Sequence, residues 1–285
     1  MQVFKDPNEM QSYLQKFRNQ GKKVGYVPTL GALHEGHMSL VRKSNKQSDI
    51  TIVSIYVNPT QFNEKSDLDK YPKTLEADSK MLIEEGCHVL FYPSTETVYP
   101  KGTDKGPDLD LKGMDELLEG AFRPGHFDGV LQVVERLLEL VKPDQLYMGQ
   151  KDFQQFTLIS HMLNQLEINT ELVVCPIKRE PNGLAMSSRN VRLSVGEREN
   201  SSVIYKTLKY VYKKFKTASA KECEEYAMAR FKKNGFKPEY FEIVDGNLLT
   251  SVDSYKDSSY IVACTAVWIG DVRLIDNKIL KKVLD

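Results

Sequence analysis

The amino-acid sequence predicts an α/β fold, in which a Rossmann-like parallel sheet with crossover helices is joined to a smaller C-terminal α+β domain. The main observation is that short apolar segments alternate with longer segments of helical period, the pattern of parallel strands connected by helices. A second observation is that lysine-rich amphipathic stretches replace this alternation after about residue 192. We therefore expect two domains, 1–178 and 179–285, the second carrying the segment MSSR near its start.

The first expected domain begins with a βαβ unit. Strands predicted at 23–28 and 50–57 are joined by a helix over 35–46. A stretch rich in glycine, proline and aspartate over 101–129 interrupts the later part of the pattern, and loops of this length are usually functional or mobile. The remaining predicted strands are 88–92, 145–148 and 171–177, preceded in turn by helices over 73–85, 129–141 and 152–166.

The second expected domain contains two amphipathic helices followed by strands. The helices are predicted over 195–216 and 220–234, and the strands lie in YFEIV at 240–244 and YIVACTAVWIG at 260–270. The second of these strands is apolar enough to belong either to a core or to an interface.

Composition limits the classes of partner. Lys and Arg total 39 and Asp and Glu total 39, so no excess of positive charge indicates nucleic acid or an acidic membrane as a partner. The four cysteines are widely separated and lack the spacing of a zinc site, which is typical of reduced thiols in a cytoplasmic protein. The sequence shows neither a signal-peptide pattern at its start nor an apolar run of about 20 residues that would span a bilayer. We expect a soluble, cytoplasmic protein.

The segment VPTLGALHEGHMSLV, residues 27–41, carries the strongest indication of chemistry. It joins the first strand of the βαβ unit to its helix, at the carboxyl end of the sheet, where a helix N-terminus offers N–H groups and partial positive charge to an anion. His37 and Met38 stand where a P-loop needs Lys and Ser or Thr, and no GxGxxG is present. Instead, His34 and His37 flank Gly36 at a spacing that places both imidazoles on one side of the first turn. We expect a phosphate site of another type.

A second segment, MSSRN at 186–190, changes the interpretation of the histidines. Alone, His34 and His37 are more simply ordinary surface residues at a helix start. Together, the HxGH and MSSR segments resemble the paired motifs of the nucleotidylyltransferase and class I aminoacyl-tRNA synthetase superfamily, which implies that both bind one ATP. Imidazole, hydroxyl and guanidinium groups can stabilise departing pyrophosphate without a covalent intermediate.

Within that superfamily, the sequence resembles the pantothenate synthetase family, also called pantoate-beta-alanine ligases. The resemblance is carried over 25–192 by VPTLGALHEGH, SIYVNPTQF, YPKTLEAD, LEGAFRPGHFDGV, YMGQKDFQQ and REPNGLAMSSRN, and more thinly by GDVRLIDN near the C-terminus. It implies ATP-dependent condensation of (R)-pantoate with beta-alanine through a pantoyl-adenylate, giving pantothenate, AMP and pyrophosphate for coenzyme A biosynthesis. It also implies Mg²⁺ on the ATP and a homodimer, and leaves the metal ligands unassigned.

The resemblance also implies roles for individual residues. His37 is expected to donate a proton or hydrogen bond to phosphate oxygens with His34 beside it, and Lys151 to neutralise phosphate charge. Gln61 and Gln155 are expected to bind pantoate, and Gln61 also beta-alanine. The implied catalytic residues are His37, His34, Lys151, Ser187, Ser188 and Arg189, and the implied ATP-binding residues are Leu30, Gly31, Ala32, Leu33, His34, Glu35, Gly36, His37, Gly149, Gln150, Lys151, Asp152, Lys178, Met186, Ser187, Ser188 and Arg189.

Several of these positions have a simpler alternative. Asp152 has the residue type and position of a helix N-cap, and a loop glutamine such as Gln61 is commonly a solvated surface residue. Lys178 would contact the adenine only through its backbone. Two positions depart from the family's pattern: Leu30 replaces a methionine of similar volume, and Gln150 replaces a glutamate.

Charged or titratable positions outside this set have mainly structural interpretations. In RPGHFDGV, Arg123, His126 and Asp128 precede a helix and could order the site, although His126 fits a purely hydrogen-bonding role equally well. Glu76 and Asp78 could lie near a metal, but carboxylates on a helix face are normally solvated, so both are left out of the expected site.

Other functions remain possible from the residues alone. A nucleotidylyltransferase acting on a phosphorylated acceptor would need an additional basic pocket, whereas Gln61 and Gln155 are neutral. A truncated tRNA synthetase is disfavoured by the zero net charge. A module that senses ATP without turnover would release no pyrophosphate.

Overall fold

The computed structural model describes residues 1–62, 68–69, 71–103 and 106–283. The chain forms two compact units. The first unit consists of 1–111, 123–149 and 158–176, and the second of 112–122, 150–157 and 177–285. Segments 112–122 and 150–157, which the sequence-based division assigned to the first domain, thus belong to the second unit.

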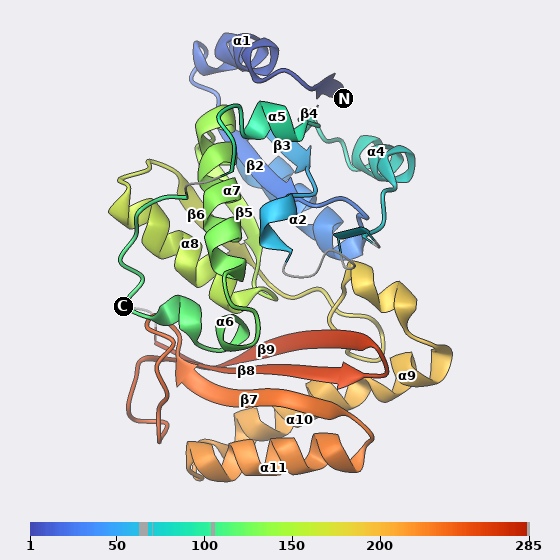
Figure 1. Ribbon diagram of the computed structural model, residues 1–285, viewed down its shortest axis with the longest axis vertical. Coiled ribbons are helices and arrows are strands. Elements are labelled where there is room, and N and C mark those ends of the chain that lie inside the picture. The colour runs from blue at the N-terminus through green and yellow to red at the C-terminus, as the bar shows by residue number, and fades with distance from the viewer. Residues whose placement is uncertain (63–67, 70, 104–105, 284–285) are drawn as a thin grey trace. The chain divides into compact units, whose positions relative to one another are not determined.

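The first unit is built on a six-stranded parallel sheet, with the strand order β1-β4-β3-β2-β5-β6 among its described residues (Figure 1). This confirms the predicted Rossmann-like class. Helix α2 packs against β2, β3 and β5, whereas α7 packs against α1 and β2. The bounds are β1 Gln2–Phe4, α1 Pro7–Arg18, β2 Val24–Thr29, α2 Glu35–Gln47, β3 Ile50–Ile55, η1 Pro59–Gln61, α4 Leu75–Glu84, β4 Val89–Phe91, α5 Thr95–Val98, α7 His126–Val141, β5 Gln145–Gly149, α8 Phe153–Gln165 and β6 Glu171–Cys175.

The interior strands of this sheet are apolar on both faces, as expected for parallel strands covered by helices. Every residue of β3 is buried, and the core around it includes Val27, Val53 and Leu90 from the strands. Met38 and Leu82 contribute from the helices α2 and α4. The short edge strand β1 and helix α1 were not predicted. Helix α1 begins with a recognisable signal, because the Asp6 carboxylate accepts from the N–H groups of the first turn and a proline follows it.

The strand order places the candidate segments at one edge of the sheet. From β2 the chain proceeds outward to β3 and β4, and it then returns to place β5 and β6 on the other side of β2. Open α/β sheets bind ligands at the carboxyl ends of the strands where the order reverses. In this sheet that edge carries the segment after β2, the η1 turn after β3 and Gly149 at the end of β5.

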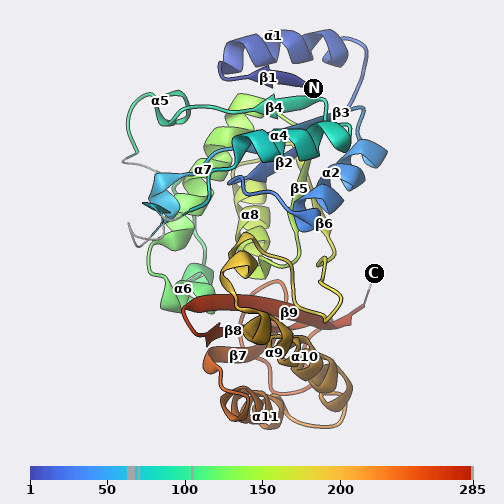
Figure 2. The ribbon, with the colours of Figure 1, turned by 90° about the vertical axis from the view of Figure 1, so that its right-hand side faces the viewer.

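The second unit contains a three-stranded antiparallel sheet of order β7-β8-β9, and Figure 2 shows α10 and α11 on one side of it. The predicted helix over 195–216 is two helices, because Ser201 ends the first of them. The apolar segment 260–270 forms the central strand β8 and is buried, which identifies it as core. The bounds are η2 Met114–Glu116, α6 Glu119–Phe122, η3 Ser188–Arg192, α9 Val195–Asn200, α10 Ser202–Lys214, α11 Ala220–Lys233, β7 Lys237–Asp245, β8 Tyr260–Ile269 and β9 Val272–Lys282.

Side-chain hydrogen bonds explain why segment 112–122 belongs with this sheet. Glu119 accepts from both terminal nitrogens of Arg273 in β9, at 2.6 and 3.0 Å, and from the hydroxyl of Tyr240 in β7 at 2.7 Å. Gln154 donates to the carbonyl oxygens of Met114 and Leu117, both at 2.7 Å. The buried ion pair ties α6 to the C-terminal strands, and the amide contacts tie the start of α8 to segment 112–122. No helix in the part of the chain that the structure describes is long and apolar enough to cross a membrane.

Candidate functional site

The turn between β2 and α2 has an unusual backbone. Gly31 has φ +85° and Ala32 has φ +49°, so two successive residues adopt left-handed conformations. A Cβ on Gly31 would lie 3.1 Å from the Ile55 side chain and 3.2 Å from a carboxylate oxygen of Asp78. The left-handed conformation favours glycine at this position, and a side chain here would also press on these two neighbours.

Asp78 holds this turn in place. Its carboxylate accepts from the N–H groups of Ala32 at 2.9 Å and Leu33 at 2.8 Å, and from the Thr74 hydroxyl at 3.1 Å. Asp78 is 2% exposed, so the interpretation of it as a solvated helix-face carboxylate is wrong. A signal was present in the sequence, because Asp78 lies one helical turn before the buried Leu82 and therefore on the apolar face of α4.

His34 and His37 form a reciprocal cap at the start of α2. The Nδ1 of His34 accepts from the N–H of Gly36 at 3.1 Å, and the Nδ1 of His37 accepts from the N–H of His34 at 3.3 Å. The ring centroids lie 4.1 Å apart. Because each Nδ1 is an acceptor, the neutral form of each ring carries its proton on Nε2, and Nε2–H is therefore the donor of each ring. This is a capping box built from imidazoles instead of Ser and Glu.

The cap determines which backbone and side-chain groups at the start of α2 can bind phosphate. A helix N-terminus is expected to offer its backbone N–H groups to an anion, but the N–H of Gly36 is directed to the His34 ring. The carboxylate of Glu35 accepts from both terminal nitrogens of Arg42, at 2.8 and 2.7 Å. Arg42 therefore neutralises the acidic residue that lies within the predicted ATP-binding segment.

Gln61 is placed by contacts with the start of α7. A Cβ on Gly129 would lie 2.3 Å from the carbonyl oxygen of Thr60, so a glycine in α7 is needed for η1 to approach. Asn58, fully buried, caps η1 and donates to the carbonyl of Gly129 at 3.0 Å. The Tyr99 hydroxyl donates to Asn58 Oδ1 at 3.1 Å, and burial raises the pKa of Tyr99 to about 12, which keeps that proton in place.

The sequence left two roles open for His126, and the structure shows it making structural hydrogen bonds on both sides of its ring. Its Nδ1 lies 2.9 Å from the carbonyl oxygen of Gln61, and its Nε2 lies 2.9 Å from a guanidinium nitrogen of Arg123. Because Arg123 can only donate, Nε2 accepts and Nδ1–H donates to Gln61. Arg123 and His126 thus fix the backbone of Gln61, which lies at the carboxyl end of β3.

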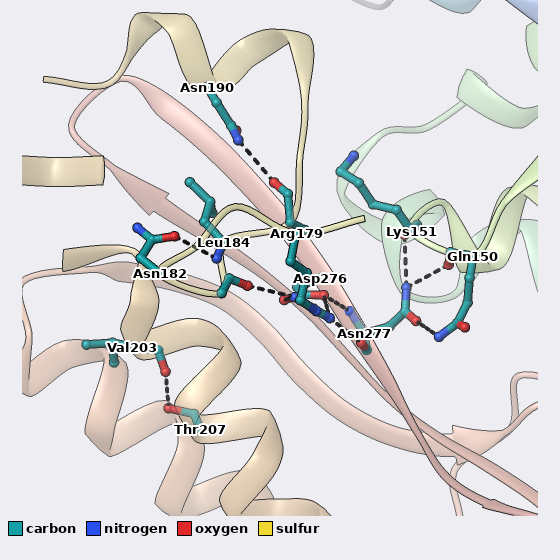
Figure 3. A network of polar contacts seen from close by, with 12 residues as sticks. Gln150, Lys151, Arg179, Asn182, Leu184, Asn190, Val203, Thr207, Asp276 and Asn277 are labelled. Carbon is teal, nitrogen blue, oxygen red and sulfur yellow. Dashed lines mark hydrogen bonds and ion pairs between the residues drawn. The ribbon is translucent and has the colours of Figure 1, made fainter. Parts of the chain in front are cut away.

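Lys151 lies in the second unit, at the start of α8. Its Nζ is 3.5 Å from the carboxylate of Asp152. The carbonyl of Asp152 accepts from the Phe156 N–H at 3.1 Å, so Asp152 occupies the N-cap position. The carbonyl oxygens of Gln150 and Lys151 each accept from the Asn277 side chain at 2.9 Å. A buried side chain of β9 therefore holds the backbone that carries Lys151 (Figure 3).

The predicted MSSR loop follows a short hairpin in the same unit. Arg179 and Ala185 form an antiparallel bridge, and the Met186 N–H donates to the carbonyl of Lys178 at 3.0 Å. Ser187 caps η3 by accepting from the Arg189 N–H at 3.3 Å. Lys178 is exposed, and its carbonyl is already engaged within the hairpin.

The structure divides the predicted site residues between the two units. It brings His34 and His37 into contact in the first unit, and Gln150, Lys151 and Asp152 in the second. The first unit contains Leu30, Gly31, Ala32, Leu33, His34, Glu35, Gly36, His37, Gln61 and Gly149, and the second contains Gln150, Lys151, Asp152, Gln155, Lys178, Met186, Ser187, Ser188 and Arg189.

Neither a protein-bound metal nor a cysteine nucleophile is indicated by the described residues. Among them, no group of three or more His, Cys, Asp and Glu side chains is arranged to hold a metal ion. All four cysteines are free and buried. Burial raises the pKa of the Cys87 thiol to about 11, which disfavours the reactive thiolate.

Comparison with known proteins gives consistent matches over nearly the whole chain. The family model described as pantoate-beta-alanine ligase matches residues 2–279. Pantothenate synthetase from Bacteroides fragilis is 47% identical over 281 residues, covering 97% of this chain and 98% of the relative. The relative of the same name from Bacteroides thetaiotaomicron is 47% identical over 287 residues, covering 99% and 100%.

Two solved structures are similar in both sequence and fold. Pantothenate synthetase from Thermus thermophilus has a TM-score of 0.91 and 34% identity, covering 99% of this chain and 100% of that one. Pantoate-beta-alanine ligase from Francisella tularensis, complexed with beta-gamma ATP and beta-alanine, has a TM-score of 0.80 and 36% identity, covering 98% of each chain.

Proposed function

The chain belongs to the pantoate-beta-alanine ligase family, and we propose that it condenses pantoate with beta-alanine in an ATP-dependent reaction to give pantothenate, AMP and pyrophosphate. Family membership over residues 2–279 supports the reaction. The observation that supports its adenylation chemistry is the pair of imidazoles at the carboxyl end of β2, which present donors in place of a nucleophile. The Francisella relative was solved with beta-gamma ATP and beta-alanine, the classes of ligand that this reaction uses.

The first step activates a carboxylate. A carboxylate oxygen of pantoate attacks the α-phosphorus of ATP, the bond from that phosphorus to the bridging oxygen breaks, and pyrophosphate leaves. Negative charge grows on the bridging and terminal oxygens of the leaving group, so hydrogen-bond donors placed there lower the barrier. The product is pantoyl-adenylate, in which AMP has become the leaving group of the acyl carbon.

Donors from His34 and His37 act on that leaving group. The reciprocal cap fixes both rings and leaves Nε2–H as the donor of each neutral imidazole. His37 donates to the phosphate oxygens, and His34 supports it. The remaining residues of Leu30–His37 line the ATP site. Because Asp78 accepts the N–H groups of Ala32 and Leu33, and Arg42 pairs with the carboxylate of Glu35, these groups shape the turn and are not assigned to the phosphates.

Cations and hydroxyls of the second unit are also assigned to the phosphates. Lys151 and Arg189 neutralise charge on the β- and γ-phosphates, and Ser187 and Ser188 donate hydrogen bonds. Gly149, Gln150, Asp152 and Met186 contact the nucleotide, and Lys178 contributes its backbone near the adenine. These roles follow the family's motif at each matching position.

The second step forms the amide. The amine of beta-alanine attacks the acyl carbon, the bond from that carbon to the phosphate oxygen breaks, AMP leaves and the nitrogen loses a proton. Gln61 and Gln155 bind pantoate through their neutral amides, and Gln61 also contacts beta-alanine. Catalysis of this step rests on holding the two reactants together.

Magnesium accompanies the ATP. Mg²⁺ is usually held by substrate phosphates and at most one or two carboxylates, and that arrangement needs no cluster of protein ligands. The ion would offset phosphate charge alongside Lys151. We further propose that the protein is a homodimer, from its family, and that it works in the cytoplasm, where its buried thiols stay reduced.

Pyrophosphate release tests this function. Purified protein is supplied with ATP, Mg²⁺ and D-pantoate, with and without beta-alanine, and glycine and phosphopantetheine serve as control acceptors. Steady turnover is expected only with pantoate plus beta-alanine. Release with phosphopantetheine but not with the pantoate pair would instead indicate a nucleotidylyltransferase, and ATP binding without any release would indicate a nucleotide sensor.

A further inference from the structure

Two consecutive residues of β9 hold the two segments of the second unit that are assigned to phosphate. Asn277 is 2% exposed, and its side chain makes three hydrogen bonds. Its amide nitrogen donates to the carbonyl oxygens of Gln150 and Lys151, both at 2.9 Å, and its amide oxygen accepts from the Gln150 side chain at 3.0 Å. All of the hydrogen-bonding directions of this amide nitrogen are therefore used to place the backbone of Lys151.

Asp276 holds the hairpin that leads into Met186–Arg189. It is 4% exposed and accepts from both terminal nitrogens of Arg179, at 2.6 and 2.9 Å. The same guanidinium donates to the carbonyl of Gly183 across the hairpin at 3.0 Å. Arg179 also lies over the Tyr205 ring, 3.9 Å from its centroid. The base of the hairpin is thus fixed to β9 by a bidentate ion pair (Figure 3).

The geometry of a strand makes these two attachments interdependent. Successive side chains of a strand point to opposite faces, and their Cα atoms are about 3.8 Å apart. Asp276 therefore lies on the same face of the sheet as Val272 and Leu274, which belong to the core beneath α10 and α11. Asn277 lies on the opposite face. A shift of β9 would move the backbone of Lys151 and the hairpin together.

Stability alone does not explain polar residues at these positions. On the face packed against α10 and α11, β9 contributes Val272, Leu274 and Leu280 to the core, and Lys278 lies over the Tyr212 ring of α10. An apolar residue at 276 would extend the core that Val272 and Leu274 begin. Burying a charged pair in place of well-packed apolar side chains is often neutral or unfavourable for stability. A charged pair in such a place is better explained by the segment that it positions.

We propose that Asp276 and Asn277 are positioning residues for pyrophosphate release, acting through the hairpin before Met186–Arg189 and through Lys151 respectively. The inference rests on the proposed function, because it takes these two segments as ligands of the ATP phosphates. It assigns a function to the GDVRLIDN segment, where the family resemblance was thin. The two residues act mainly on the first step, because the second step involves no pyrophosphate and depends only on the remaining contacts of these segments with the adenylate.

Separate assays of the two half-reactions test this inference in the full-length protein. The first assay measures pyrophosphate release from ATP, Mg²⁺ and pantoate, and the second measures AMP release from supplied pantoyl-adenylate and beta-alanine. For Asn277→Ala we expect the first rate to fall by about 10²-fold, the effect of a displacement near 1 Å, and the second to fall by at least about ten-fold less. Asp276→Asn weakens the Arg179 contact without removing it, and we expect a smaller loss, again mainly in the first assay.

The matched control is Thr265→Val in β8. Thr265 is buried and pairs with Asp276 in the sheet, but its hydroxyl donates to the carbonyl of Tyr240 at 2.7 Å and not to a phosphate-binding segment. It removes a buried hydrogen bond from the same sheet, so its melting temperature should fall while both half-reactions stay near wild type. Asn277→Ser, which keeps a hydroxyl donor, provides a second measurement if the alanine variant does not fold, with an intermediate loss expected in the first assay.

A double variant tests whether Asn277 acts through Lys151. If it does, Lys151→Ala with Asn277→Ala should release pyrophosphate no more than about two-fold slower than Lys151→Ala alone, because the effects of coupled residues do not add. Equal losses in both half-reactions, a similar loss in Thr265→Val, or additive effects in the double variant would overturn the inference while leaving the proposed function intact. A wild-type protein that releases no pyrophosphate with pantoate would overturn the proposed function itself, and the inference with it.

Discussion

Asp78→Ala is the substitution whose effect the structure specifies most fully. It removes a buried carboxylate that accepts two backbone N–H groups of the turn before His34. One of those N–H groups belongs to Ala32, whose left-handed backbone depends on such support. The alanine side chain cannot replace either acceptor, and the 2% exposure of Asp78 indicates that water has little access to the site.

The expected cost follows from the lost contacts. A buried donor left without an acceptor costs about 1–3 kcal/mol, so the two N–H groups together predict a loss of about 2–5 kcal/mol in the free energy of unfolding, allowing for relaxation and water entry. The contact from the Thr74 hydroxyl adds little, because Thr74 is exposed and can bond to water instead. Asp78→Asn keeps the shape and one acceptor oxygen, and should lose roughly half as much.

Urea denaturation of each variant measures this quantity, with an unchanged slope required for the comparison. Glu76→Ala is the matched control, because Glu76 lies exposed on the same helix, and it should change stability by no more than about 0.5 kcal/mol. A loss below about 1 kcal/mol in Asp78→Ala, or an equal loss in Glu76→Ala, would refute the role assigned to Asp78.

Three further predictions concern chemistry, pH and thiol reactivity. His37→Ala should lower the rate of pyrophosphate release by about 10²- to 10⁴-fold with the circular dichroism spectrum unchanged, and nearly wild-type turnover would exclude His37 as the donor. Burial, and then repulsion by Glu224, raise the pKa of the Glu242 carboxyl in the folded protein. The folded state therefore binds more protons between the ordinary pKa near 4.3 and the raised one, and stability falls as pH rises through that window. Glu242→Gln should raise the melting temperature at pH 8 and have little effect at pH 4, whereas an equal shift at both would contradict the burial argument. Finally, Cys87, with a pKa of about 11, should react with a thiol reagent at pH 8 only after unfolding, as followed by peptide mass mapping.

The sequence predicted the first unit well because its signals are local. Buried parallel strands appear as continuous apolar segments, and the helices between them show their period and their caps. Strand β9 was missed because VRLIDNKILKK mixes polar and apolar residues without a clean alternation. Its two polar residues are buried by contacts with Gln150, Lys151 and Arg179, which are distant in the sequence.

The assignment of 112–122 to the second unit could not be predicted for the same reason, because it depends on residues that are distant in the sequence. The segment is held in that unit by the ion pair of Glu119 with Arg273, and no local sequence pattern indicates that these two residues are partners. The sequence motifs identified the residues of the candidate site, but they did not predict the hydrogen bonds that these residues make. A capping box of two histidines lies outside the usual Ser and Glu pattern, so the Nε2–H assignment needed the structure.

The central claim, that the pantoate carboxylate is activated by adenylation, is tested most directly by following oxygen. Pantoate labelled with ¹⁸O in its carboxylate is incubated with ATP, Mg²⁺, beta-alanine and the protein, and the products are analysed by mass spectrometry. Attack of the carboxylate on the α-phosphorus predicts one ¹⁸O in AMP and none in pyrophosphate. Label in inorganic phosphate, with ADP as the nucleotide product, would show attack on the γ-phosphorus and contradict the account.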